Sequence, residues 1–238
     1  MISAPMMTTP RSTDRAVKVL ETALLRDLGL GRGRSSLGQS MVSLEFGKRE
    51  IICAMGDAGD GVYFVERGRV KVYRLSGDGR EITLGILAPG DIFGEEALLR
   101  VDPRATFAET LEASTVFFVD AREFRRIASR SPELAMRLFE IAGTRLARTQ
   151  QQVEDLAFRG VTSRVANLLI GMADDHGVTE GSDIVLTPRL THQQMASLVG
   201  TTRETFTATL SKLSNSDLIR SSRRAVRILD LGALQALV

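Results

Sequence analysis

A glycine, a carboxylate and an arginine lie near one another in the sequence and could jointly hold a sugar phosphate. Gly94 and Glu95 end the segment 89–95 (PGDIFGE), and a short stretch then leads to Pro103 and Arg104. Arginine makes charge-assisted, often bidentate contacts with phosphate, and glycine lets backbone N–H groups approach an anion closely. A carboxylate accepts hydrogen bonds from sugar hydroxyl groups. These residue types have the chemistry that binding a phosphate carried on a sugar would need.

Few residues could support catalysis or hold a metal. His176 and His192 are the only histidines, and both lie outside the strand-rich part of the chain, so the histidine-ligated metal of a β-roll enzyme is not expected. Cys53 is the only cysteine, which excludes an intrachain disulfide and a cysteine-ligated zinc or iron–sulfur site. We therefore predict no enzyme activity, no catalytic residues and no bound metal. Haem held by another ligand stays open, and an absorbance spectrum would reveal it.

A second group of polar residues lies in the stretch 186–214, which has the pattern of two short helices joined by a tight turn. Thr191 is predicted to cap the first helix together with Gln194, because a threonine-x-x-Gln pair satisfies N–H groups left unpaired at a helix start. Gly200 suits the positive φ that a chain often needs on leaving a helix. Apolar residues supply one face of each helix: Met195, Leu198 and Val199 on the first, and Phe206, Leu210 and Leu213 on the second.

The second helix of this pair is predicted to begin at Thr201 or Thr202, with Glu204 completing a capping box with Thr201. The spacing fits a helix-turn-helix, whose second helix enters the DNA major groove, and fits a structural helical hairpin equally well. Local charge favours DNA, because from 189 to 227 only Glu204 and Asp217 are acidic, and a basic surface suits phosphate contacts. The basic residues of this segment are Arg189, Arg203, Lys212, Arg220, Arg223, Arg224 and Arg227.

The strand-rich part of the chain runs from Val42 to Val119. Residues 70–73 alternate apolar and polar with period two, and Asp78-Gly79 is a strong hairpin signal. Many short strands separated by regular turns indicate a small β-barrel or jelly-roll. The apolar runs are 51–52, 62–65, 70–75, 82–87 and 115–119.

A long helix is predicted next, with Ser131 as N-cap, Pro132 as its first residue and an end near Phe158. Its apolar residues follow one another at alternating spacings of 4 and 3, which is typical of a coiled-coil seam and requires a partner helix. Thr149 is the polar residue on this seam, where it could set the register of two helices or touch a ligand. The apolar seam residues are Ala135, Phe139, Ala142, Leu146, Val153 and Leu156.

The whole chain of 238 residues is long enough for two modest domains, with 43% hydrophobic residues, 25% charged residues and a net charge of +2. It lacks a secretion signal and any apolar run near the roughly 18 residues of a membrane helix, so we expect a cytoplasmic protein with no membrane partner. A basic hairpin at 218–229, directly after the helix pair, predicts the wing of a winged helix. The fold class is therefore α+β, in four parts: an N-terminal tail and helix (1–40), a β-roll (41–130), a dimerisation helix (131–159) and a winged helix-turn-helix (160–238).

These parts resemble the cAMP receptor protein/FNR family of bacterial transcription regulators over residues 40–238. The segments 89–95 and 103–104 look like the phosphate-binding cassette of the family, 156–164 its hinge, and 199–205 the start of its recognition helix. The resemblance implies a jelly-roll domain of the cyclic-nucleotide-binding type and a homodimer formed through helix 131–159. It also implies binding to an inverted repeat in double-stranded DNA.

The resemblance also assigns a nucleotide site, with cAMP as an effector and not as a required cofactor. Arg104 would hold the phosphate, Thr149 would meet the adenine amino group, and the remaining positions are Gly94, Glu95, Ala105 and Arg145. Ala105 stands where cAMP-binding members usually have Ser or Thr; losing such a hydrogen bond costs on the order of 1.5–3 kcal/mol, although Thr106 could replace it. Glu96 adds an acid where an anion should bind. Two interpretations therefore stay open: a cAMP-modulated regulator, and an effector-independent one with a vestigial pocket.

DNA contacts follow from the resemblance residue by residue. Arg203 would read guanine through O6 and N7, and Glu204 would accept from cytosine N4 besides any capping role. Ala208 replaces a second base-reading arginine, so specificity at the outer base pair should change. The expected phosphate contacts are Thr191, His192, Gln193, Thr202 and Thr205, with Arg223 and Arg224 on the wing.

One further partner is implied, because the acidic loop 174–183 lies where the family often contacts RNA polymerase. The cysteine-ligated cluster of a redox or gas sensor of the FNR type is excluded by the single cysteine, Cys53. A cyclic-nucleotide module acting through a protein partner is disfavoured by the helix-turn-helix and the basic wing.

Overall fold

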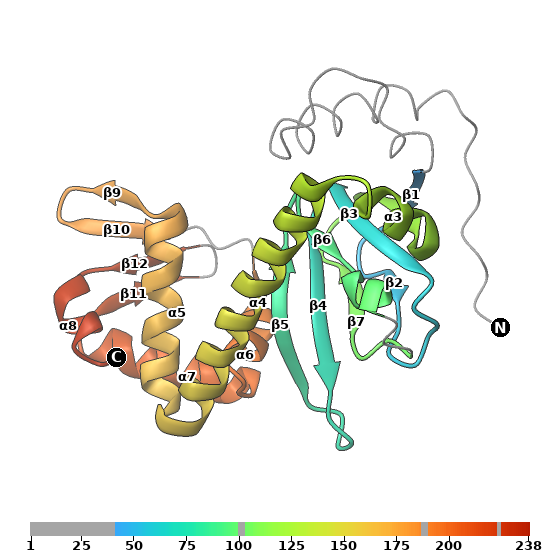
Figure 1. Ribbon diagram of the computed structural model, residues 1–238. Helices are drawn as coiled ribbons and strands as arrows, with labels where there is room; N and C mark the ends of the chain where they lie inside the picture. The colour runs from blue at the N-terminus through green and yellow to red at the C-terminus, as the bar shows by residue number, and fades with distance from the viewer. Residues whose placement is uncertain (1–40, 100–102, 187–189, 223–224) are drawn as a thin grey trace. The chain divides into compact units, whose positions relative to one another are not determined.

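The computed structural model describes residues 41–99, 103–186, 190–222 and 225–238, which form an α+β fold. The described residues form two compact units: residues 41–74 with Leu84–Arg145, and Leu75–Thr83 with Leu146–Val238 (Figure 1). The predicted N-terminal tail and helix lie outside the described residues, as do Arg189, Arg223 and Arg224. Every helix within the described ranges is too short or too polar to cross a membrane.

Two four-stranded sheets make the predicted β-roll, in the orders β1-β8-β3-β6 and β2-β7-β4-β5. All five predicted apolar runs fall within strands, which confirms the strand-rich segment. Strands β1, β6 and β7 are additional. The strands are β1 (Val42–Phe46), β2 (Ile51–Cys53), β3 (Gly61–Arg67), β4 (Val70–Leu75), β5 (Glu81–Leu87), β6 (Ile92–Phe93), β7 (Phe107–Thr110) and β8 (Ser114–Asp120).

Period-two alternation in strand β3 separates two hydrophobic clusters. Val62 and Phe64 point to a cluster that includes Phe124 of helix α3 (Ala121–Ala128), whereas Tyr63 and Val65 join a cluster formed with the other sheet. Successive side chains of a strand face opposite sides of its sheet, so β3 contributes to both layers at once. This alternation explains why residues 61–65 are all buried.

Helix α4 (Pro132–Phe158) begins where the sequence predicts, since the backbone N–H of Leu134 donates to the Ser131 hydroxyl at 3.3 Å. Leu134 is buried in the cluster that contains Phe64, and Leu138 and Ile141 pack against the same cluster. The spacings of 4 and 3 between these residues place them on one face of the helix. This inner stripe is distinct from the predicted seam.

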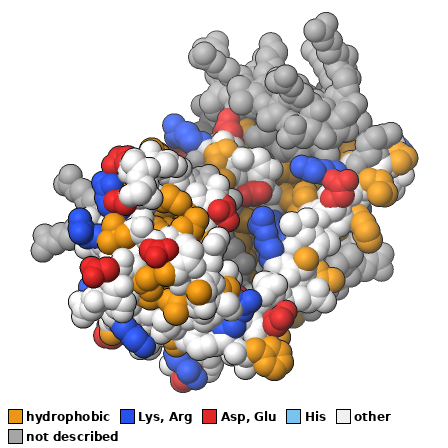
Figure 2. Space-filling view, turned by 90° about the vertical axis from the view of Figure 1, so that its left-hand side faces the viewer, with side chains coloured by type: hydrophobic (Ala, Val, Ile, Leu, Met, Phe, Trp, Pro, Cys, Tyr) orange, Lys and Arg blue, Asp and Glu red, His pale blue; other side chains and the backbone are white. Residues whose placement is uncertain are grey.

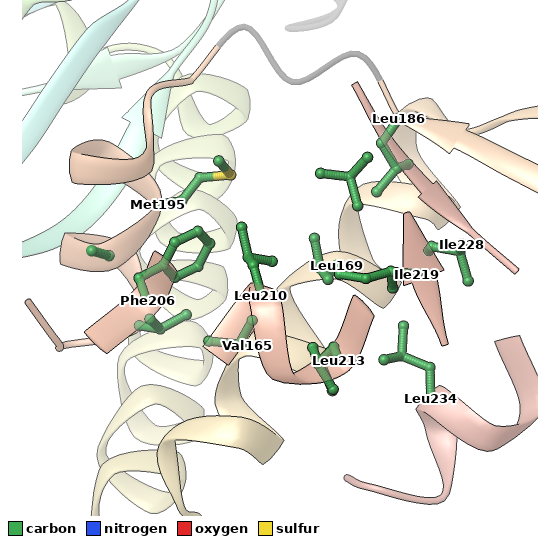
Figure 3. Packing of buried hydrophobic residues seen from close by; sticks show 14 residues of the cluster. Val165, Leu169, Leu186, Met195, Phe206, Leu210, Leu213, Ile219, Ile228 and Leu234 are labelled. Carbon is green, nitrogen blue, oxygen red and sulfur yellow. The ribbon is translucent and has the colours of Figure 1, made fainter. Parts of the chain in front are cut away.

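The second unit packs helices against a sheet of order β11-β12-β10-β9. Figure 3 shows its core, in which Val165, Met195 and Phe206 converge from three different helices. The short helix α8, not predicted from the sequence, covers this core through Leu234, which is fully buried. The elements are α5 (Val161–His176), β9 (Val178–Glu180), β10 (Asp183–Leu186), α6 (His192–Leu198), α7 (Arg203–Asn215), β11 (Ile219–Ser221), β12 (Val226–Ile228) and α8 (Leu231–Gln235).

The segment 174–183 is acidic and largely exposed where its side chains are described, as expected, but it is not a loop. Helix α5 continues to His176, and β9 pairs with β10 in an antiparallel hairpin that turns at Gly181, whose φ is +66°. Glu180 and Asp183 of this hairpin form ion pairs with Arg227 of β12, at 2.8 and 3.4 Å. The acidic side chains are thus partly neutralised by the neighbouring strand.

Candidate functional site

Helices α6 and α7 form the predicted pair, and a threonine caps the start of each helix. Thr191 and Gln194 form the predicted capping box at the start of α6. At the start of α7 the cap is Thr202, whose hydroxyl accepts from the backbone N–H of Thr205 at 3.2 Å. The predicted box between Thr201 and Glu204 is therefore wrong, because Thr202 as N-cap makes Thr205 the third helical residue.

Replacing Thr202 with alanine is expected to destabilise the second unit by about 1 kcal/mol, the usual effect of losing an N-cap hydroxyl. Urea unfolding followed by circular dichroism measures this loss. Thr201→Ala is the matched control, since Thr201 does not cap the helix. Equal destabilisation by both substitutions would contradict the capping assignment.

Helix α7 buries one face and exposes the other. Phe206, Leu210 and Leu213 enter the core, as predicted. The residues expected to contact DNA, which are Arg203, Glu204, Thr205 and Ala208, are all exposed on the opposite face, and the cap Thr202 is exposed beside them. Glu204 is the second residue of α7, so it is not the capping-box partner of Thr202.

Gly200 sits in the turn between the two helices and meets two requirements. Its φ is +63°, as the sequence predicts, and a Cβ there would lie 2.7 Å from Cδ2 of Leu156. A larger residue would therefore be strained and would also displace Leu156. Leu156 thus packs toward the helix pair at the end of the predicted seam.

His192, expected to touch a DNA phosphate, is half-buried between the two helices. Its ring meets Phe206 edge-on at 5.7 Å, and Nδ1 lies 3.1 Å from the Thr207 hydroxyl. Thr207 donates its own proton to the Arg203 carbonyl at 2.8 Å, so its oxygen accepts from Nδ1–H of His192. The ring therefore helps to hold α6 on α7. Thr191 and Gln193 are exposed at the start of α6.

Arg164 is a structural contributor whose role the sequence did not indicate. Its Nε donates to the Val199 carbonyl at 2.9 Å, and Nη1 donates to the Arg159 carbonyl at 2.8 Å. Both acceptors lie near helix ends, where carbonyl groups lack helical partners. Arg164 therefore ties the start of α5 to the turn after α6.

The predicted wing is present as strands β11 and β12, but its charge differs from the expectation. Arg227 is engaged by Glu180 and Asp183, so it adds little to a basic surface. Figure 2 shows basic and acidic side chains intermingled on one face of the molecule. Among the described residues of the segment, Arg203, Lys212 and Arg220 are the exposed basic side chains.

A second set of predicted residues comes together in the first unit, around the turn from β6 into the short helix η1 (Glu95–Leu99). Gly94 has a φ of +77°, and a Cβ on it would lie 2.8 Å from Nη1 of Arg104 and 3.0 Å from the Gly61 carbonyl. Only glycine fits this position without strain or displacement. Gly94 therefore lines a cradle that is formed by Asp60, Gly94, Glu95, Glu96 and Arg104.

Arg104 lies at the centre of the cradle and is fully buried, with a side chain 1% exposed. Nη2 donates to Asp60 at 3.0 Å and to the Gly61 carbonyl at 2.9 Å, and Nη1 lies 3.5 Å from Glu96. Burial by itself lowers the pKa of the Arg104 guanidinium, but the acidic groups around it outweigh burial and leave that pKa raised. The guanidinium is therefore a permanent buried cation.

Glu95 is also paired, because its Oε1 accepts from Nη1 of Arg145, whose Nη2 donates to the Ile92 carbonyl. The structure thus joins two of the predicted nucleotide-site residues directly. The other carboxylate oxygen of Glu95 is buried and makes no hydrogen bond to any described residue. Thr149 lies one helical turn beyond Arg145 on α4, and Ala105 follows Arg104 at an exposed position.

The cradle contains acids that the sequence assigned other roles or none. The sequence pattern does not identify Asp60 as a site residue, although it holds Arg104 from the loop before β3. Its contact joins segments far apart in the chain, so no local pattern could reveal it. Tyr63, whose ring lies 5.3 Å from the Arg104 guanidinium carbon, was missed for the same reason.

Cys53 lies in the hydrophobic cluster next to the cradle and is buried. Burial raises the pKa of its thiol to about 11. The thiol is therefore protonated at neutral pH, and a protonated buried thiol is a poor nucleophile and metal ligand. The structure gives this cysteine a packing role.

The outer face of helix α4 carries the predicted seam. Ala135, Phe139, Ala142, Leu146, Thr149 and Val153 are exposed. Phe139 is 75% exposed and Leu146 and Val153 are each 60% exposed, which is unusual for large apolar residues on one stripe. This face of the helix is therefore available to a partner of matching shape.

Two family models match the chain. The model of the cyclic nucleotide-binding domain matches residues 43–131, and that of the Crp-like helix-turn-helix domain matches residues 163–237. The first covers the two sheets and the cradle, and the second covers helices α6 and α7 and the wing.

The sequence similarity to relatives extends over most of this chain and of each relative. The chain is 32% identical over 196 residues to the "CRP-like cAMP-activated global transcriptional regulator" of Mycobacterium tuberculosis, covering 82% of this chain and 88% of the relative. It is 28% identical over 213 residues to the "Global nitrogen regulator" of Synechococcus elongatus, covering 89% and 93%. A CooA variant from Carboxydothermus hydrogenoformans has a similar solved structure, with a TM-score of 0.78 and 25% identity over 98% and 99% of the two chains.

Proposed function

Because the chain belongs to the Crp-Fnr family of transcription regulators, which are not enzymes, we propose that it acts as a homodimer on an inverted-repeat DNA site. The observation that carries this proposal is the exposed face of helix α7, on which Arg203, Glu204 and Ala208 lie opposite a buried apolar face. Side chains at the start of such a helix reach base edges in the major groove. Cytoplasmic genomic DNA is therefore the proposed partner.

Arg203 and Glu204 are the proposed base-reading residues, for guanine and cytosine respectively. Thr191, Gln193, Thr202 and Thr205 are proposed to contact phosphates from exposed positions around the two helix starts. His192 would reach a phosphate only through Nε2, because Nδ1 is engaged by Thr207.

Selection of binding sites from random double-stranded DNA with the full-length protein, at moderate salt, tests this proposal. The enriched sites should be inverted repeats whose half-sites lie one helical turn apart, about 34 Å. Enrichment of single half-sites would contradict the homodimer, and no enrichment at all would contradict the DNA-binding role.

We propose cAMP as the effector, bound in the cradle with its phosphate near Arg104. The matching cyclic nucleotide-binding domain model and the name of the Mycobacterium tuberculosis relative support this choice. Glu95 would contact the sugar, and Arg145 would lie near the ligand. Thr149 would contact the adenine. An effector-independent regulator is the second candidate, and the specific observation favouring it is that Asp60 and Glu96 already pair with Arg104.

Titrating cAMP into a DNA-binding assay separates the two candidates. A cAMP-modulated regulator should change its DNA affinity by about 5- to 150-fold, the usual range of coupling between two sites. An unchanged affinity at millimolar cAMP would rule out modulation and favour the effector-independent candidate. cGMP, which differs from cAMP only in its base, is the control for recognition of the adenine.

RNA polymerase is a further proposed partner, contacted through the segment 174–183. In this segment the residues of β9 are all exposed, so the hairpin offers a surface although its acids are partly paired. A pull-down of RNA polymerase with and without operator DNA tests the contact.

A further inference from the structure

The cradle already holds an anion beside its central cation. Nη1 of Arg104 lies 3.5 Å from Oε1 of Glu96, is buried, and makes no hydrogen bond to any described residue. We propose that Glu96 is a built-in counter-anion for Arg104, which an anionic ligand has to displace before the guanidinium can bind it. This inference rests on the proposed nucleotide site, and it makes ligand binding an exchange of one anion for another.

The two sides of the guanidinium are engaged differently. Nη2 has its hydrogen-bonding capacity filled by Asp60 and the Gly61 carbonyl. Nη1 has only the long contact to Glu96, and it faces the position that the missing side chain of Gly94 leaves open. A ligand oxygen would therefore approach Nη1, the side that Glu96 now neutralises.

Glu96 can move while Arg104 stays in place. Backbone hydrogen bonds fix Arg104, whose N–H donates to the Asp57 carbonyl at 2.8 Å and whose carbonyl accepts from Gly56 at 2.9 Å. Glu96 instead lies in the short helix η1 with a side chain 27% exposed. Its carboxylate could turn toward water while the guanidinium stays in place.

The net charge around Arg104 is the reason why an anionic ligand has to displace Glu96. The cradle and its neighbour Arg145 contain two guanidinium groups, on Arg104 and Arg145, and three carboxylates, on Asp60, Glu95 and Glu96. The excess of one negative charge opposes the entry of a phosphodiester. Moving the Glu96 carboxylate into solvent would remove the nearest like charge from the incoming phosphate.

Glu96→Gln is expected to strengthen anion binding about tenfold or more, because the amide keeps the shape of the side chain and removes the charge that competes for Nη1. Calorimetry with cAMP, and separately with inorganic phosphate, on the full-length protein measures this gain. Glu112→Gln is the matched control, since Glu112 pairs with Arg69 in the same unit but outside the cradle, at 3.1 Å.

The two ligands distinguish failure of this inference from failure of the nucleotide proposal. If the Glu96→Gln variant binds phosphate more tightly than the unmodified protein, while neither of the two binds cAMP, the nucleotide proposal fails and the counter-anion role stands. If cAMP binds the unmodified protein and Glu96→Gln equally well, or the variant more weakly, the counter-anion role fails. It fails also if the variant binds neither probe.

The melting temperature gives a second test of the pairing between Glu96 and Arg104, which does not depend on ligand affinity. Glu96→Gln should lower the melting temperature of the protein, and added phosphate should restore it, because a buried guanidinium would lose one of its counter-charges. In an Arg104→Met background the same substitution should leave the melting temperature unchanged. An equal shift in both backgrounds would overturn the pairing.

Discussion

Replacing Arg203 with alanine should weaken binding to the selected DNA site by about 1–3 kcal/mol per half-site, or about 5- to 150-fold. The guanidinium is exposed at the first residue of α7, and the helix is capped by Thr202 and not by Arg203, so its removal should leave the fold unchanged. The loss should fall on the base pair that Arg203 contacts, whose preference for guanine should relax. Fluorescence anisotropy with sites mutated at each position measures both effects.

Lys212→Ala is the matched control, because it removes one positive charge from the exposed surface of the same helix, near its other end. That variant should weaken binding to all sequences to a similar, small extent, as expected for loss of general electrostatic attraction. Sedimentation analysis should show that both variants remain dimeric. If Arg203→Ala kept the full sequence preference of the unmodified protein, the assignment of α7 as the recognition helix would be wrong.

Local patterns in the sequence predicted the helix pair and its turn because the determinants there are close in the chain. The Thr191–Gln194 box and the positive φ of Gly200 depend on residues within one or two helical turns. The choice between Thr201 and Thr202 could not be made locally, since both residues are threonines before a helix. Tertiary packing of Phe206 into the core fixes the rotation of α7, and with it the cap.

The cradle was predicted less completely because its contacts connect distant segments. The motif identified Gly94, Glu95 and Arg104, but the pairing of Arg104 with Asp60 joins positions 44 residues apart. The pair Glu95–Arg145 joins positions 50 residues apart and became visible only once α4 was placed on the β-roll. The ion pairs of the β9–β10 hairpin could not be predicted for the same reason, because its acids pair with Arg227 on a strand far along the chain.

Helix α4 divides its residues between a face that packs within the chain and a face that is exposed, and this division supports the proposed dimer. Leu134, Leu138 and Ile141 are satisfied within the chain, because they pack on the β-roll. Phe139 and Leu146 lie on the other face and remain 75% and 60% exposed. Full burial of such a side chain contributes about 1.5–3 kcal/mol, so a seam containing several of them from each of two copies could hold a stable dimer.

Leu146→Glu should therefore weaken the dimer by at least about 100-fold, because it removes an apolar contact and places two carboxylates opposite each other in the seam. A dissociated monomer can contact only one half-site, so affinity for the inverted repeat should fall with the dimer, while affinity for an isolated half-site should change little. Sedimentation equilibrium and anisotropy on the two DNA sites measure these effects.

Thr144→Glu is the matched control for this experiment, since Thr144 is exposed on the same helix but lies off the seam. It adds the same charge and should leave both the dimer and the DNA affinity unchanged. Because Leu146 is exposed in the single chain, its replacement should also leave the unfolding midpoint of a dilute, monomeric sample unaltered. A Leu146→Glu protein that remained fully dimeric would show that the two copies associate through another surface, and the exposed stripe on α4 would then require a different partner.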